Sequence, residues 1–304
     1  MSIEIVFLGT SAGLPTEERN VSSVIVRRES EIFMFDVGEG TQKQLIKANI
    51  GIKQKLTIFI SHLHGDHIFG LLGLIQSYNL IGRKTALEIF GPKDLKKFVY
   101  ENMKLLDINL TYPLIIRNSK QGIITEGKDY TIKAIESDHR IESYSYCIEE
   151  KLRPGKFNPE KANKLEIPIK FWKTLKSGFP VTINKKNIDA SLIVSPPRKG
   201  RKIVYSGDTK PTERMMTFAK NADILIHEAT YDEKMRARAD KYFHSTARQA
   251  AEIAKKANVQ LLVLTHMSPR YKDPSILYKE AYEIFKNVMI AEDLLKINVN
   301  LSKD

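Results

Sequence analysis

Short apolar runs rich in β-branched residues alternate with segments of helical periodicity along most of the chain. The apolar runs, bounded by Gly, Pro or charged residues, predict strands at residues 3–8, 22–26, 32–35, 56–60, 86–90, 131–135, 202–205, 224–226 and 261–264. Apolar residues spaced as on one helix face predict helices at residues 41–48, 69–78, 95–103, 246–256 and 275–285. This order predicts a layered α/β domain in which helices cover sheets.

Residues 151–180 interrupt the alternation with several prolines, two glycines and no sustained periodicity. They hold eight Lys and Arg residues and two Glu residues, a net +6 that is half of the formal charge of +12. Aromatic side chains lie among these cations, at Phe157, Phe171, Trp172 and Phe179. Such a mixture suits phosphate contacts and stacking on bases. A flexible linker or a loop that contacts a second subunit is an equal alternative.

The charge balance of the whole chain, 48 Lys and Arg against 36 Asp and Glu, indicates a polyanionic partner. Nucleic acid ranks ahead of a membrane, and a solvated lysine-rich surface is an equal alternative. The single cysteine, Cys147, excludes an internal disulfide and a cysteine-rich zinc module, which fits a reducing cytoplasm. No apolar run approaches the ~20 residues that cross a bilayer, and the start MSIEIVFLGT lacks the basic region of a secretion signal. We therefore expect a cytoplasmic protein.

Three histidines and an aspartate lie within six positions directly after the predicted strand 56–60, in Ser61-His62-Leu63-His64-Gly65-Asp66-His67. This density serves neither a core nor a surface, whereas imidazole and carboxylate are ligands that suit zinc. A turn at Gly65 lets alternate side chains face one point and the following pair face another. The motif therefore predicts a metal centre.

Further metal ligands are expected at the ends of other strands, where α/β proteins assemble their sites. Four histidines remain, His139, His227, His244 and His266, and each lies near the end of a predicted strand or the start of a helix. Asp208 follows the strand 202–205 within Ser206-Gly207-Asp208-Thr209.

This succession, H-x-H-x-D-H, a distant His, S-G-D-T and a terminal T-H, resembles the metallo-β-lactamase superfamily, and more narrowly the tRNase Z family. The motifs of that family stand here as His227-Glu228-Ala229-Thr230 and His244-Ser245-Thr246. The opening residues 7–15 and the stretch 196–202 are similar as well. Its P-x-K-x-R-N segment reads Pro15-Thr16-Glu17-Glu18-Arg19-Asn20, with Glu17 where lysine is usual.

The resemblance implies a four-layer αββα sandwich formed by residues 1–304 as one domain, with residues 151–180 as an inserted arm that binds substrate. It also implies two zinc ions per subunit. His62, His64 and His139 would hold the first ion, Asp66, His67 and His266 the second, and Asp208 would bridge them. A shared carboxylate is the side chain that lets seven ligands serve two ions, each with a position open for water or substrate.

The activity implied by the resemblance is removal of the 3′ trailer from precursor tRNA, which leaves a 3′-hydroxyl on the tRNA and a 5′-phosphate on the trailer. Asp66 would orient the attacking water or accept its proton. His244 would protonate the leaving oxygen, with Glu228 orienting its ring. His227 is expected to be structural.

The expected substrate contacts are Arg19, Asn20, Lys156, Lys173, Lys176 and Arg198. The resemblance also implies a homodimer. Another hydrolase of the superfamily, such as a small-molecule phosphodiesterase, would share the metal centre but would leave the basic arm unexplained. A non-catalytic RNA-binding protein of the same fold would be expected to lack some of the ligands.

Overall fold

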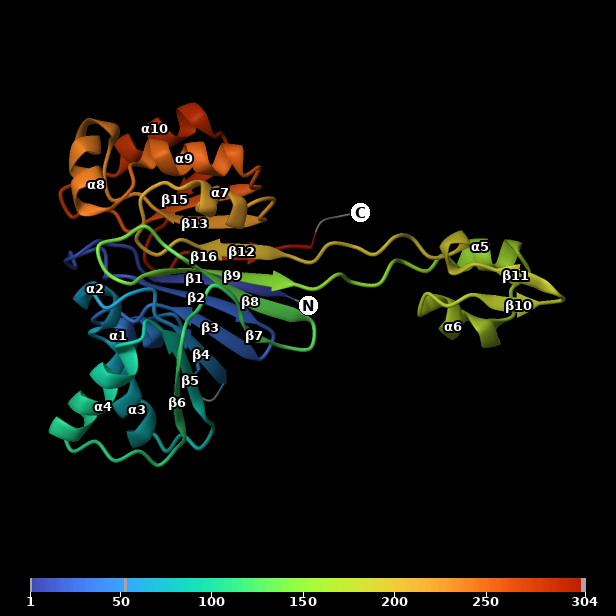
Figure 1. Ribbon diagram of the computed structural model, residues 1–304, viewed down its shortest axis with the longest axis horizontal. Helices are drawn as coiled ribbons and strands as arrows, with labels where there is room; N and C mark the ends of the chain where they lie inside the picture. Colours follow the sequence, from blue (N-terminus) through green and yellow to red (C-terminus); the bar gives the residue numbers. More distant parts are fainter. Residues whose placement is uncertain (1, 52–53, 302–304) are drawn as a thin grey trace.

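The computed structural model describes residues 2–51 and 54–301 and consists of four layers (Figure 1). Two seven-stranded sheets pack face to face, and helices cover the outer face of each. The predicted αββα fold class is therefore confirmed. None of the helices in the described part of the chain has both the length and the apolar character needed to cross a membrane.

The first sheet has the strand order β16-β1-β2-β3-β4-β5-β6. Its first three pairings are antiparallel and its last three are parallel. The strands are β16 (Lys296–Val299), β1 (Ile3–Gly9), β2 (Ser23–Arg28), β3 (Glu31–Phe35), β4 (Lys55–Phe59), β5 (Leu87–Gly91) and β6 (Leu114–Asn118).

The second sheet repeats this pattern in the order β7-β8-β9-β12-β13-β14-β15, with three antiparallel and then three parallel pairings. The strands are β7 (Gly122–Glu126), β8 (Tyr130–Glu136), β9 (Tyr144–Glu150), β12 (Lys202–Tyr205), β13 (Ile224–Glu228), β14 (Leu261–Thr265) and β15 (Val288–Ile290). The two halves of the domain thus share a topology that has no visible counterpart as a sequence repeat.

The helices cover the sheets in two sets (Figure 1). One set covers the first sheet and contains α1 (Thr41–Lys47), α2 (Gly65–Ile68), α3 (Leu71–Leu80) and α4 (Leu95–Leu105). The other covers the second sheet and contains α7 (Glu213–Phe218), the 3-10 turn η3 (Glu233–Met235), α8 (Arg236–Tyr242), α9 (Ala247–Lys256) and α10 (Ser275–Ile284). Helix α9 lies close to its sheet because its buried face carries alanines, among them Ala250 and Ala254.

Aromatic rings fill the space between the two sheets. Phe35 and Phe59 of the first sheet stack with centroids 5.5 Å apart, and Phe35 also stacks on Tyr205 of the second sheet at 5.3 Å. Such rings bury a large apolar area and hold the sheets in register with each other. This packing fixes the relative position of the strand ends that carry the site.

The segment between β9 and β12 leaves the second sheet and forms an arm that stands away from the layers (Figure 1). It contains α5 (Pro159–Lys164), η1 (Ile169–Phe171), α6 (Trp172–Lys176), the hairpin β10 (Val181–Ile183) and β11 (Lys186–Ile188), and η2 (Ala190–Leu192). The arm therefore spans residues 151–201, and the expected limit at residue 180 was too short. The β10–β11 hairpin lengthens the arm beyond that limit. Asn184 and Lys185 form its turn, since both take the positive φ that such a two-residue turn requires.

The arm is also more ordered than its sequence indicated. It has a small core of Ala162, Ile167, Leu175, Val181, Ala190 and Ile193. Three of its four aromatics, Phe157, Phe171 and Trp172, pack against this core, and the Trp172 indole donates a hydrogen bond to the Ile167 carbonyl. Of the aromatics expected to stack on bases, Phe179 is the exposed one, at 64%.

Candidate metal centre

The histidine-rich motif lies where β4 ends and α2 begins, and His64 is the residue before the first turn of α2. His62 and His67 are fully buried, whereas His64 and Asp66 are half-buried at the opening of the site. The second oxygen of Asp66 accepts a hydrogen bond from the Gly13 backbone N–H at 2.7 Å. This bond fixes the carboxylate from a loop that lies far away in the sequence.

The second sheet supplies the remaining candidate ligands. His139 follows β8, Asp208 follows β12 and His266 follows β14. Two residues here have a positive φ, Gly207 at 57° and His266 at 56°, so the chain turns sharply directly before or at the candidate ligand. Both sheets therefore contribute to one site at the ends of their strands.

The ligand atoms form two groups, within each of which all atoms lie inside 4.8 Å of one another. One group is His62, His64, His139 and Asp208, and the other is Asp66, His67 and His266. These are the two sets that the resemblance implies. A third combination, Asp208, His244 and His266, meets the same criterion.

Asp208 lies between the two main groups. Its Oδ2 is 3.6 Å from His62 Nε2 and its Oδ1 is 3.4 Å from His266 Nε2. Two ligands of one tetrahedral zinc ion, each at 2.0–2.1 Å from it, lie about 3.3 Å apart. The carboxylate thus has the position of a bridge between two ions.

The polar atoms of the cluster fit a metal better than they fit each other. Asp208 Oδ1 is buried and accepts no hydrogen bond from the described residues. His67 Nε2 and His266 Nε2 face each other at 3.3 Å, and two nitrogens that face each other share at most one proton. Burying these atoms without a partner is costly, whereas cations placed among them would satisfy all of them.

The protonation states favour the same conclusion. Burial lowers the pKa of His62, and the neighbouring His67 lowers it further, so the ring is neutral as a ligand must be. Burial raises the pKa of Asp208, but the nearby His266 and His67 lower it more, to well below its usual range. His62 is therefore neutral and Asp208 is ionised. Burial lowers the pKa of His67, but the Asp208 and Asp66 carboxylates raise it more, to well above its usual value.

Asp36, which follows β3 directly and was not predicted, holds the first sheet's part of the site together. Its Oδ2 lies 2.8 Å from His67 Nδ1 and accepts hydrogen bonds from the Ser61 and Tyr205 hydroxyls at 2.8 and 2.7 Å. The carboxylate thereby fixes the ring of His67 and its tautomer. Its position at a strand end, like that of the predicted ligands, is the sequence signal that would have found it.

Two other histidine rings are fixed by similar contacts on their outer nitrogens. His139 Nδ1 lies 3.0 Å from the Phe243 carbonyl, and His266 Nδ1 lies 2.9 Å from the Thr230 hydroxyl. Thr230 is part of the H-E-A-T motif, but the spacing of that motif did not reveal this role.

We expect Asp36→Asn to weaken metal binding about 10- to 100-fold, the usual cost of losing the partner of a ligating histidine. The amide keeps the shape of the carboxylate but loses the charge that faces His67. Metal affinity, measured by competition with a chromophoric chelator, tests this. Asp223→Asn is the matched control, because Asp223 accepts a hydrogen bond from the Lys202 N–H, as Asp36 does from the Ser61 N–H, but belongs to neither group. Equal affinities of both variants would contradict the role given to Asp36.

His244 and Glu228 form a pair beside Asp208. His244 Nδ1 lies 3.0 Å from Glu228 Oε1, and the buried carboxylate also accepts hydrogen bonds from the Thr209 N–H and the Thr230 hydroxyl. Burial lowers the pKa of His244, but Glu228 raises it more, to about 9. The ring is thus oriented and charged, as expected for a proton donor. His227 belongs to none of the three groups and is fully buried.

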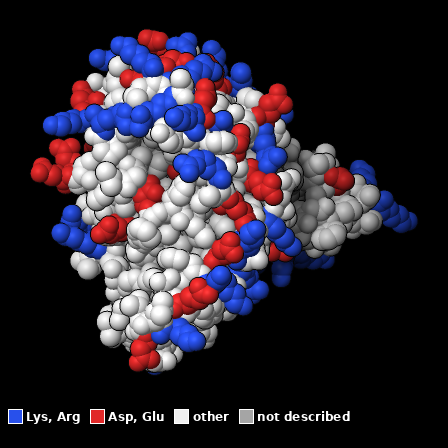
Figure 2. Space-filling view, turned by 60° about the vertical axis from the view of Figure 1, so that its left-hand side comes forward, with Lys and Arg blue, Asp and Glu red and all other residues white. Residues whose placement is uncertain are grey.

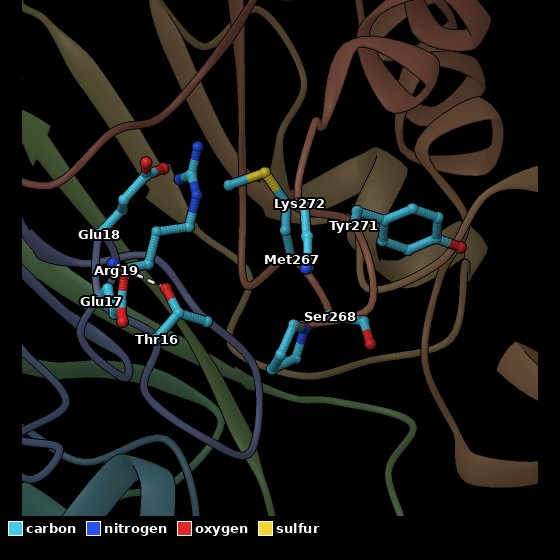
Figure 3. A pocket seen from close by; sticks show the side chains of 9 residues that line it. Thr16, Glu17, Glu18, Arg19, Met267, Ser268, Tyr271 and Lys272 are labelled. Carbon is cyan, nitrogen blue, oxygen red and sulfur yellow. Dashed lines mark hydrogen bonds between the residues drawn. The ribbon is translucent and has the colours of Figure 1, made fainter.

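The loop with Arg19 lines a cavity of about 420 Å³ (Figure 3). Residues 267–269, which directly follow His266, form part of the opposite wall together with Tyr271 and Lys272. Arg19 Nη1 donates to the Thr10 hydroxyl and the Ala291 carbonyl, both at 2.7 Å, and Asn20 Nδ2 donates to the Glu39 carbonyl. These two expected substrate contacts therefore hold the loop in place.

The other expected substrate contacts lie on the arm and not near the cluster. Lys173 is exposed on α6, and Lys176 lies over the Phe157 ring, 4.7 Å from its centroid. Lys156 and Arg198 lie in the two chains that connect the arm to the sheet, and Arg198 Nε donates to the Pro154 carbonyl. The expected substrate contacts therefore lie in two distant regions, the loop that lines the cavity and the arm.

The fold and this cluster define a hydrolase of the metallo-β-lactamase superfamily. A family model described as a beta-lactamase superfamily domain matches residues 165–267, and one described as anti-Pycsar protein Apyc1 matches residues 3–152. The metallo-beta-lactamase fold protein YhfI from Bacillus subtilis has a TM-score of 0.70 at 20% identity, covering 98% of this chain and all of that one. This likeness supports the fold.

More similar relatives identify the family within this superfamily. The chain is 42% identical to the ribonuclease Z of Nitrosopumilus maritimus, over 98% of this chain and 100% of that protein. The crystal structure of the short form of human tRNase Z has a TM-score of 0.72 at 29% identity, covering 97% of this chain and 98% of the other. The chain belongs to the ribonuclease Z family.

Proposed function

We propose that the chain is an endoribonuclease that removes the 3′ trailer from precursor tRNA, leaving a 3′-hydroxyl on the tRNA and a 5′-phosphate on the trailer. The observation that carries the proposal is the convergence of all seven candidate ligands and the His244–Glu228 pair in a chain 42% identical to a ribonuclease Z. A cytoplasmic location follows from the proposed substrate.

Two zinc ions are the cofactors that fit the cluster best, since its donors are imidazoles and carboxylates. His62, His64 and His139 would hold one ion, Asp66, His67 and His266 the other, and Asp208 both. When bound, such ions supply positive charge for a phosphodiester and activate water for attack.

The protein's own side chains would orient the reactants and move protons. Asp66, held by the Gly13 N–H, has a carboxylate at the opening of the site that can orient the attacking water or accept its proton. His244, charged and oriented by Glu228, can donate its proton to the leaving 3′ oxygen. Leaving-group protonation matters because a ribose 3′ oxygen is a poor leaving group without it.

End-mapped cleavage of a trailer-bearing precursor tRNA, with and without a zinc chelator, tests the proposal. We expect one chelator-sensitive cut beside the discriminator base and a 3′-hydroxyl on the tRNA product. Intact precursor tRNA together with hydrolysis of bis(p-nitrophenyl) phosphate would favour a small-molecule phosphodiesterase instead.

The arm and the metal cluster lie at opposite ends of β9 and β12. The Tyr144 N–H at one end of β9 donates to the Ser61 carbonyl beside His62, whereas the arm begins after Glu150 at the other end. Seven residues of strand separate these ends by about 20 Å. A tRNA bound on the arm would therefore be cut most readily by the cluster of a second subunit.

The face over α1–α4 offers a surface for that second subunit. Figure 2 shows an area without charged side chains in the lower part of this face, bordered by both acidic and basic side chains, and a row of Lys and Arg side chains above it. Large apolar side chains are exposed on these elements, with Ile46 at 78%, Phe69 at 65% and Leu105 at 84%. Exposed apolar area of this kind suits a subunit contact. A homodimer is thus part of the proposal.

Subunit mixing tests whether the arm works across a dimer. One partner carries Asp208→Asn and an intact arm, and the other has residues 151–200 replaced by Asn-Gly but an intact cluster. Each alone should leave precursor tRNA uncut, and the refolded mixture should cleave it. A mixture in which both partners carry Asp208→Asn is the control. No recovery in a mixture shown by mass to contain heterodimers would contradict action across the dimer.

A further inference from the structure

The two chains that connect the arm to the sheet, residues 151–158 and 193–200, pair with each other in one continuous register. We refer to them as the stalk. Backbone hydrogen bonds join Glu150 with Arg201, Arg153 with Arg198, Lys156 with Ser195 and Asn158 with Ile193. From pair to pair, one residue number rises by as much as the other falls, so the chains run antiparallel with no register shift. The stalk is therefore a two-chain ribbon and not a pair of loose linkers.

The pairing includes β-bridges between Arg153 and Arg198 and between Phe157 and Val194. Pro154, Pro196 and Pro197 lie in the ribbon, and each proline fixes its φ angle and lacks an N–H group for a regular β ladder. The chains approach closely at Gly155, where a Cβ atom would lie 1.7 Å from the Ser195 carbonyl oxygen. Prolines and close backbone contacts both limit the bending of the stalk.

A buried group of charges holds the stalk where it meets the sheets. Glu150 accepts two hydrogen bonds from the Arg201 guanidinium, both at 2.8 Å, and one from Arg28 Nε at 3.0 Å. All three side chains are at most 4% exposed. Arg28 belongs to β2 of the first sheet, and Arg201 Nη1 also donates to the Val299 carbonyl of β16. The charges thus connect the base of the stalk, which begins in the second sheet, to the first sheet.

The same group of charges extends to the turn before β8. Arg28 Nη2 pairs with Asp129 at 2.6 Å, and the Asp129 carbonyl accepts a hydrogen bond from the Lys151 N–H, the first residue of the stalk. The arginines outweigh burial and lower the pKa of Glu150 to about 2, so the group is charged at neutral pH. Buried ion pairs add little stability compared with apolar residues of the same size. Fixing the direction in which the stalk leaves the sheets explains these buried ion pairs better than stability does.

We propose that Arg28, Glu150 and Arg201 are positioning residues that fix the direction of the stalk, so that the arm presents bound RNA at a set place relative to the sheets. They touch neither the substrate nor the metal cluster. The proposal rests on the proposed function only as far as the arm binds RNA, because the anchoring itself is a property of the protein alone.

The first test measures the direction of the arm directly. Spin labels on Lys186→Cys in the arm and Lys255→Cys on α9 report the distance distribution between the arm and the body. Cys147 does not interfere, since it is fully buried and burial raises its pKa to about 12. We expect a narrow distribution that widens in Arg28→Met and narrows again in part in Arg28→Lys.

Arg28→Met is chosen because the protein should still fold. Glu150 keeps both hydrogen bonds from Arg201, and Asp129 is 40% exposed and can be solvated. Gly155→Ala is a second variant that disturbs the stalk far from the sheets, and it should widen the distribution as well. Arg117→Met is the control, because it breaks the exposed Arg117–Glu88 pair with the same change in charge. An unchanged width in Arg28→Met, together with a wider distribution in Gly155→Ala that shows the measurement detects a looser stalk, would overturn the proposal, and so would an unchanged width in both variants.

The second test is kinetic. Arg28→Met should raise KM for precursor tRNA about tenfold, because a stalk that swings is correctly directed for only a fraction of the time. It should leave kcat for precursor tRNA and the hydrolysis of bis(p-nitrophenyl) phosphate unchanged. Equal losses on both substrates would indicate a general structural role and contradict the proposal. If the wild type cuts no precursor tRNA, the proposed function fails, while the distance measurement still decides whether the anchor exists.

Discussion

Asp208→Asn is expected to lower cleavage of precursor tRNA more than about 100-fold, beyond the usual cost of losing an outer partner of a ligand. Asp208 lies between the two ligand groups, with one oxygen toward His62 and the other toward His266. The amide has the same shape but no negative charge and only one acceptor oxygen, so it cannot bridge two cations. Elemental analysis of the purified variant should show fewer than two ions per subunit.

The thermal stability of this variant provides a second measurement. A ligand at 100 times its Kd adds about 2.7 kcal/mol to the free energy of unfolding, so zinc should stabilise the wild type and have a smaller effect on Asp208→Asn. Asp138→Asn is the matched control, because Asp138 is an exposed acid next to His139 that belongs to neither group. Full metal content and activity in Asp208→Asn would refute the bridging role.

His244→Ala is expected to reduce kcat for precursor tRNA about 10²- to 10⁴-fold, the range typical of a positioned general acid. Metal content should stay the same, because the seven proposed ligands remain. The loss should be small for bis(p-nitrophenyl) phosphate, since nitrophenolate leaves readily without a proton. Comparing kcat on the two substrates therefore isolates the role of the acid.

Glu228→Gln should give a smaller loss of the same kind, because the amide still orients the His244 ring but no longer stabilises its charge. If His244 were instead a metal ligand together with Asp208 and His266, we would expect a different result for His244→Ala. In that case His244→Ala would lose metal and would lose activity equally on both substrates.

The sequence predicted the central elements of the fold and missed elements whose residues look polar or exposed. All the predicted strands and helices overlap observed ones. Strand β9 was missed because its sequence, YSYCIEE, contains Ser and Glu, yet most of it is buried. Its last residue, Glu150, is buried through its ion pair with Arg201, a partner that no local pattern reveals. Edge strands β6 and β7 were missed because much of each is exposed.

The candidate site was predictable where its residues form a dense motif or end a strand. The spacing of His62, His64, Asp66 and His67 located the centre, and the strand ends located Asp208 and His266. The outer partner Thr230 was missed because it acts through a contact with His266, which is far away in the sequence. Asp36 was missed although it follows a predicted strand, because it belongs to no motif and its contact with His67 forms only in the fold. The contact of Arg19 with the Ala291 carbonyl, which holds the Arg19 loop, was not predictable for the same reason, because the two residues are far apart in the sequence.

The shared topology of the two sheets has a consequence for the metal centre. Asp36 follows the strand at which the first sheet changes from antiparallel to parallel pairing, and Asp208 follows the corresponding strand of the second sheet. The centre thus lies on the seam between two half-domains of like design, with ligands from each. Metal ions bound there would link the two half-domains, so their binding free energy would also stabilise the contact between the halves.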